Sequence, residues 1–146
     1  MKTAPLTLFL VFLALIAFVL HLVFETSHVF LYTGYEDLSP YLPITVWAAI
    51  GDVFYTLGIY LVFALFKRDV LWMRNISKTD VFMLAVAGFL LAVGIEWKAL
   101  FLERWVYLPS MPIIPFLEVG LSPVLQMTIL LPFSVYITGR FFRSSL

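Results

Sequence analysis

Residues 5–30 read PLTLFLVFLALIAFVLHLVFETSHVF, and within this stretch only His21, Glu25 and His28 are strongly polar. A helix needs roughly 20 apolar residues to cross a bilayer core about 30 Å thick. The apolar run is longer than the roughly 7–15 residues of a secretory signal, and no small-x-small cleavage site follows it. The stretch therefore predicts a retained transmembrane helix.

Three further stretches have the same character, at about residues 44–66, 80–102 and 119–139. The whole chain is 63% hydrophobic and 12% charged, whereas soluble domains are about 45–50% apolar and 25% charged. We therefore predict one all-α integral membrane domain over residues 1–146, a bundle of four transmembrane helices. Asp80, which follows Ser77 and Thr79, is expected at the start of the third helix.

Charge and cysteine content exclude several classes of function. Nine basic and nine acidic residues cancel, so no basic surface indicates a nucleic-acid partner. The chain has no cysteine, which excludes disulfides, thiolate metal sites, iron–sulfur clusters and thiol catalysis.

The loop charges predict an orientation. Basic residues concentrate in the 67–80 connection and the tail, whereas the 31–43 loop has no Lys or Arg. Cytoplasmic loops carry an excess of these residues, so both termini and the 67–80 connection are expected on the cytoplasmic side. The 31–43 and 103–118 loops are expected to face the outside or the lumen. The membrane would be the plasma membrane of a prokaryote or the endoplasmic reticulum of a eukaryote. The basic residues concerned are Lys67, Arg68, Arg74, Lys78, Arg140 and Arg143.

The loop at residues 104–118 is unusual because it contains Pro109, Pro112 and Pro115. Prolines at this density exclude a helix. We interpret the segment either as an ordered interfacial loop or as a lid over the bundle. Trp105 and Tyr107, at the start of the loop, are expected to anchor it at the membrane interface.

Polar residues fall on the small-residue face of each predicted helix. Small residues mark faces that pack closely against other helices, and residues three, four or seven apart share a face. With a rise of about 1.5 Å per residue, these polar residues converge in the outer half of the membrane. The predicted cluster consists of His21, Glu25, Asp52, Glu96 and Gln126.

Purely structural roles remain open for each member of the cluster. His21 and Glu25 could form a structural pair, Asp52 and Gln126 could bond helices together, and Glu96 could pair with Lys98 or Arg104. His28 and Glu118 are expected near the headgroups, in contact with solvent.

A metal site has little support in the sequence. Glu25-Thr26-Ser27-His28 has the Glu-x-x-His spacing of di-iron bundles, but those sites use this motif on two helices. Here it occurs once, and the chain has two histidines. We therefore expect neither a metal nor another cofactor.

The segments Leu20-His21-Leu22-Val23-Phe24-Glu25, Phe30-Leu31-Tyr32 and Tyr35-Glu36-Asp37-Leu38 resemble the first conserved helix of the EXPERA superfamily. Members include the emopamil-binding protein, a sterol isomerase, and the sigma-two receptor. The isomerases carry a catalytic His-x-x-x-Glu on this helix, which His21 and Glu25 match. The four-helix core also agrees in number.

Other helices agree less closely with that superfamily. Asp52 stands where the isomerases carry Glu, and Gln126 with Pro132 is a loose counterpart of an Asn and a Pro on their last helix. The last helix has no clear Asn-x-x-Trp, and the third helix matches poorly, with Glu96 as an additional acid.

The resemblance implies an intramembrane isomerase that moves a double bond in an isoprenoid or sterol-like lipid. His21 with Asp52 would supply a proton and Glu25 would accept one. Aromatic faces can stabilise a developing carbocation. The positions expected to bind substrate are Glu96, Gln126, Tyr55 and Trp47.

Two other functions stay open. With Glu25, Asp52 and Glu96 inside and no inward Lys or Arg, the same pocket could bind sterols or cationic amphiphiles without turnover. Alternatively, the chain could be a structural or assembly subunit. An ion carrier is disfavoured because the inner half of the helices is almost entirely apolar. A homodimer is left open.

Overall fold

The computed structural model describes residues 6–35 and 38–144. Residue 5, the expected start of the first span, lies outside them, as do Glu36 and Asp37 of the EXPERA-like segment. Four long helices dominate: α1 (Leu6–His28), α2 (Leu38–Lys67), α3 (Lys78–Phe101) and α4 (Leu121–Ser144). Each is long and apolar enough to cross a membrane. The predicted all-α fold with four membrane-spanning helices is confirmed.

Short elements connect these helices. The 3₁₀ turns η1 (Val29–Leu31) and η2 (Trp72–Asn75) follow α1 and α2, and two strands, β1 (Ile113–Ile114) and β2 (Val119–Gly120), lie between α3 and α4. The strands pair antiparallel. No helix forms within the 104–118 segment, as its prolines predict.

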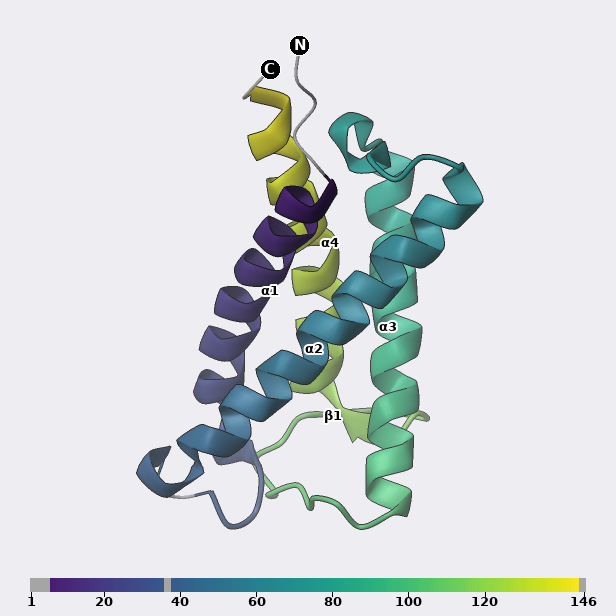
Figure 1. The fold of residues 1–146 in the computed structure, drawn as a ribbon. Coiled ribbons are helices and arrows are strands. Elements are labelled where there is room, and N and C mark those ends of the chain that lie inside the picture. Colours follow the sequence, from purple (N-terminus) through teal and green to yellow (C-terminus); the bar gives the residue numbers. More distant parts are fainter. Residues whose placement is uncertain (1–5, 36–37, 145–146) are drawn as a thin grey trace.

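The helices pack unequally. α1 contacts both α2 and α4, and α3 packs along α4, whereas α2 and α3 make few direct contacts. In Figure 1, α2 runs obliquely across the front of the bundle. Gly88 allows the close approach of α3 to α4, because a Cβ there would lie 2.4 Å from the carbonyl oxygen of Met127. Helix α3 is thus closely packed against α4 and loosely packed against α2.

The two ends of the bundle differ in chemistry. The start of α1, the end of α4 and the 68–77 connection lie together at one end, here called the inner end (Figure 1). There Ser77 and Asp80 form a reciprocal capping box that begins α3, which confirms the predicted role of Asp80. Lys67 Nζ lies 2.7 Å from Asp80 Oδ1 and ties α2 to α3.

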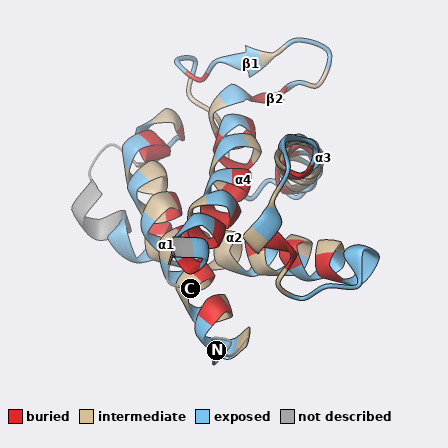
Figure 2. Cartoon of the chain, turned by 90° about the horizontal axis from the view of Figure 1, so that it is seen from above, coloured by how far each residue is buried: buried red, intermediate tan, exposed pale blue. Residues whose placement is uncertain are grey.

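The outward surface is what a lipid environment requires. Figure 2 shows exposed residues on the outer faces of the helices and buried residues between them. Large apolar side chains such as Phe54, Leu65 and Phe66 are exposed, and burying them in lipid removes the cost of hydrating them.

The interior of the inner half carries more hydroxyl groups than expected, because Thr56, Tyr60, Ser134 and Thr138 are all buried there. Ser134 and Thr138 donate to carbonyl oxygens of their own helix, at 2.7 and 2.8 Å. Bonding within one helix satisfies a buried hydroxyl without linking it to a neighbour. Among the residues that the structure describes, Ser134 and Thr138 are therefore not links in a chain of hydrogen bonds across the membrane.

Candidate functional site

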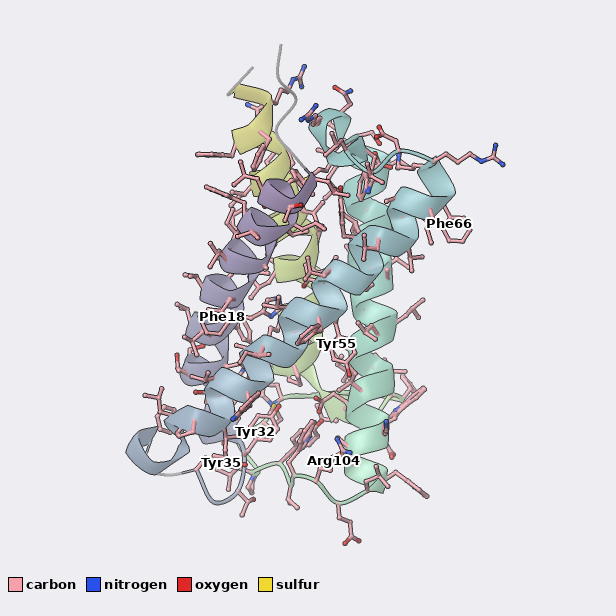
Figure 3. All side chains as sticks on the ribbon, in the orientation of Figure 1. Phe18, Tyr32, Tyr35, Tyr55, Phe66 and Arg104 are labelled. Carbon is pink, nitrogen blue, oxygen red and sulfur yellow. The ribbon has the colours of Figure 1, made fainter. Side chains whose placement is uncertain are left out.

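A cavity of about 330 Å³ lies in the outer half, opposite the inner end. All four helices and the outer loops line it, and its size suits a small organic ligand. Figure 3 labels four of its residues: Tyr32, Tyr35 and Arg104 lie at this end of the bundle, and Tyr55 lies nearer its middle. Because α2 and α3 make few contacts, the cavity occupies the space that their packing would otherwise fill.

Gln126 on α4 joins polar groups from two other helices. Its Nε2 donates to Glu25 Oε1 on α1 at 2.9 Å and to Asp52 Oδ2 on α2 at 2.8 Å. The same Oδ2 lies 3.2 Å from His21 Nδ1. The structure thus brings four of the five predicted polar residues into one hydrogen-bonded cluster.

The hydrogen-bond geometry of this cluster favours the His21 tautomer that carries its proton on Nδ1. An amide nitrogen carries two hydrogens, and here the two carboxyl oxygens take both, although His21 Nδ1 also lies 3.1 Å from it. His21 Nδ1 is then free to donate to Asp52. His21 Nε2 is buried without a partner, and an unprotonated nitrogen fits there because no N–H is left unsatisfied.

His21 itself does not line the cavity, whereas Glu25, Asp52 and Gln126 do. It is completely buried and reaches the cavity through Asp52. This places it behind the carboxyl group, in the position of a group that orients and tunes an acid.

The expectation that His28 contacts solvent is wrong. Its side chain is 6% exposed and lines the cavity, with Nε2 3.6 Å from Glu25 Oε2. The rings of Phe24 and Tyr32 lie 5.0 and 5.7 Å away, centroid to centroid, and cover it. Phe24 covers His28 from one turn earlier on α1, whereas the chain must fold back at η1 to bring Tyr32 over it, and helical periodicity does not reveal that second contact. Glu118 is exposed, as expected.

Glu96 on α3 belongs to the cavity, but it pairs with neither Lys98 nor Arg104. Its Oε2 accepts from Trp105 Nε1 at 3.2 Å and from the hydroxyl of Tyr107. Tyr107 Oη in turn accepts from the backbone N–H of Gly120 at 3.0 Å. Trp105 and Tyr107 are thus partners of a buried acid as well as residues at a span end, and their position in the sequence does not indicate this second role.

The outer loop is tied down along its length. Tyr32 and Tyr107 form an isolated antiparallel bridge, with Thr33 N donating to Val106 O and Leu108 N donating to Leu31 O, both at 2.9 Å. Burial raises the pKa of Tyr107, as does its hydrogen bond to Glu96. The phenol therefore stays protonated, and remains a donor, throughout the neutral range.

Of the two aromatic residues predicted to bind substrate, one lines the cavity and the other does not. Tyr55 lines the cavity, but Trp47 does not, and 72% of its surface is exposed. Trp47 precedes Asp52 by five residues, and at 3.6 residues per turn this turns it well away from the face of Asp52. Its proposed role beside the substrate is therefore withdrawn, and Trp105, which lines the cavity, is the better candidate.

One positive charge was also missed, since the exposed side chain of Arg104 lines the cavity. The expectation of no inward Lys or Arg is wrong at this one position. Among the described residues, no three His, Asp or Glu side chains are placed to hold a metal ion.

Comparison with known protein families, curated proteins and solved structures finds no match for the chain. The resemblance to the EXPERA superfamily therefore stands on its sequence motif alone. Chemically, the cavity combines paired carboxyl groups, a histidine behind one of them and aromatic rings in an otherwise apolar lining. Such a set can move protons or hold a polar group of a lipid.

Proposed function

We propose that the protein is an integral membrane enzyme that shifts a double bond in an isoprenoid or sterol-like lipid. The observation that carries the proposal is the Gln126 cluster: one amide holds two carboxyl groups, Glu25 and Asp52, side by side at the wall of a cavity. Two adjacent carboxyl groups, one protonated and one ionised, are what a proton-in, proton-out reaction needs.

The reaction conserves atoms and charge. Asp52, whose Oδ2 is held by Gln126 and His21, would give the proton on its other oxygen to one alkene carbon and leave a carbocation. The carboxylate of Glu25 would then remove a proton from a neighbouring carbon, and the electrons of that C–H bond form the new double bond. Proton transfer from Glu25 back to Asp52 would complete the cycle without a cofactor.

Two features of the cavity support a cationic intermediate. The aromatic rings of Tyr55 and Trp105 line it, and ring faces attract positive charge. Once Asp52 has given its proton to the alkene, its carboxylate would balance the positive charge of the carbocation. Tyr55 lines the cavity and is 42% exposed, which suits a substrate that arrives from the membrane.

The competing function is binding without turnover. Three carboxyl groups line the cavity against the single guanidinium of Arg104, which favours a cationic amphiphile, while the apolar lining suits a neutral sterol. Mass spectrometry of lipids that co-purify with the protein would identify the ligand class directly.

Deuterium transfer from solvent tests the enzymatic function. Purified protein is incubated in deuterated water with isoprenoid or sterol alkenes, and isomerisation should insert deuterium into the lipid. Glu25→Gln keeps the acceptor for Gln126 but removes the titratable group, so incorporation should fall about 10²–10⁴-fold, with lipid affinity within a few-fold of the original.

The matched control is Glu103→Gln, which alters an exposed acid next to the outer loop and should leave incorporation unchanged. The enzymatic function would be contradicted if Glu25→Gln incorporated as much deuterium as the original protein. It would also be contradicted if the original protein incorporated no deuterium. In a pure binder of cations, Asp52→Asn should instead weaken a cationic amine more than tenfold and leave a neutral sterol unaffected.

A further inference from the structure

The cavity has two polar walls that do not share hydrogen-bond partners. Glu25, Asp52 and Gln126 form one on α1, α2 and α4. Glu96 forms the other on α3, and its partners Trp105 and Tyr107 both belong to the outer loop. The proton-transfer step uses only the first wall, so the second acid needs its own explanation.

Glu96 is nearly enclosed yet incompletely bonded. Its side chain is 4% exposed, and both loop donors bind the same oxygen, Oε2. Its Oε1 accepts no hydrogen bond from any residue within the described ranges. Because Glu96 lines the cavity, Oε1 is the oxygen available to a molecule bound there.

We propose that Glu96 Oε1 binds the hydroxyl group of a lipid alcohol. The inference rests on the proposed function and refines it, because it assigns the substrate a hydroxyl end at α3 and places its reacting double bond at the opposite wall. The substrate class becomes an isoprenoid alcohol or a sterol rather than a hydrocarbon.

The surroundings favour an alcohol over an amine. A hydroxyl both donates and accepts, so it can bond Glu96 in either protonation state of the carboxyl group, whereas an ammonium only donates. Arg104 lines the same cavity and repels a second cation. The α3 wall next to Glu96 is apolar, with Ala92 and Ile95, which suits the hydrocarbon body of the ligand.

Binding of matched probes tests the assignment without any need for turnover. Farnesol and cholesterol are compared with their methyl ethers, and farnesol also with farnesylamine, by competition against tritiated farnesol or cholesterol on protein in nanodiscs. The ethers cannot donate, so each alcohol should bind about tenfold more tightly than its ether. Glu96→Leu should abolish this preference, while Glu96→Gln, which retains an acceptor and a donor, should keep it within a few-fold.

The alcohol-to-ether ratio within one variant is insensitive to partial misfolding, because both probes report on the same folded fraction. Glu103→Leu is the control and should leave the ratio unchanged. Equal binding of alcohols and ethers, saturable binding of neither alcohol, or a preference that survives Glu96→Leu would overturn the proposal. The proposal would also be overturned if farnesylamine bound tenfold more tightly than farnesol and lost this advantage in Glu96→Gln, because that result identifies a cation site.

Failure of the proposed function would look different. Glu25→Gln should retain the alcohol-to-ether ratio whether or not the lipid is isomerised. A preserved ratio without deuterium incorporation would leave Glu96 as a hydroxyl site in a binding protein. Deuterium incorporation without any preference for the alcohol would remove the Glu96 site alone.

Discussion

One amide nitrogen, Nε2 of Gln126, holds the carboxyl groups of two other helices, Glu25 at 2.9 Å and Asp52 at 2.8 Å. Gln126 itself is 2% exposed. Hydrogen bonds to charged groups stabilise a fold by about 1.5–3 kcal/mol. Removing only one of two buried partners costs more than replacing both with apolar groups, because the remaining partner is left without a hydrogen bond. Gln126 is therefore a structural centre of the cluster as well as its proton-transfer scaffold.

Exchanging Gln126 for Met, which has nearly the same length, should lower the free energy of unfolding in detergent by about 2–3 kcal/mol. Asp52→Leu alone should also destabilise. The double variant should lose less than the two single variants together, because the bond between Gln126 and Asp52 is lost in both single variants and can be lost only once. Strict additivity in the denaturation series would show that the amide and carboxylate do not depend on each other.

Prediction from sequence was sound for residues that share a helical period and weak for residues that meet through loops. His21, Glu25, Asp52 and Gln126 converge because each lies on the small-residue face of its helix. Trp47 does not line the cavity, because it lies at a similar depth but on another face of α2 than Asp52. The partners of Glu96 lie nine and eleven residues further along, beyond the end of α3, where no periodicity applies.

At the scale of elements, the 102–120 loop behaves as a fastened cover. Tyr107 makes three attachments: a backbone bridge to Tyr32 after η1, a bond to Glu96 on α3, and a bond from Gly120 at the other end of the loop. Trp97 Nε1 also donates to Leu117 O at 2.7 Å and binds the far side of the loop to α3. The proline content predicts the absence of a helix here, but not these contacts, which depend on the three-dimensional path of the chain.

Tyr107→Phe removes the phenolic hydroxyl and with it the bonds to Glu96 and Gly120. Amide hydrogen exchange in residues 105–120 should then accelerate, because local opening no longer breaks these two bonds, while α1 and α4 exchange as before. Tyr136→Phe, which alters an exposed tyrosine on α4, is the control. Equal exchange in the Tyr107 variant and the original protein would show that backbone pairing alone holds the loop.

For the whole molecule, the basic connection after α2, the start of α1 and the end of α4 share one end. The orientation of that end toward the cytoplasm follows from the positive-inside rule and remains a prediction. Because the chain has no cysteine, single introduced thiols give an unambiguous readout. Ser77 is unsuited to this use, since its hydroxyl caps α3.

A cysteine at Thr79, exposed in the first turn of α3, should resist a membrane-impermeant maleimide in intact cells and react once the cells are lysed. A cysteine at Ser110, exposed in the outer loop, should react in both conditions, because that loop is expected to face the outside. The reverse labelling pattern would invert the orientation of all four helices and place the cavity in the cytoplasmic leaflet.

The unequal packing of α3 also has a mechanical consequence. Backbone contact at Gly88 couples α3 to α4, whereas α2 and α3 make few direct contacts and are joined at the inner end by Lys67 and Asp80. A change in the spacing of α2 and α3 would therefore widen or narrow the outer part of the gap, with the inner ion pair as its pivot. Because both helices present exposed apolar side chains to the bilayer, the thickness and composition of the lipid should influence the width of the cavity.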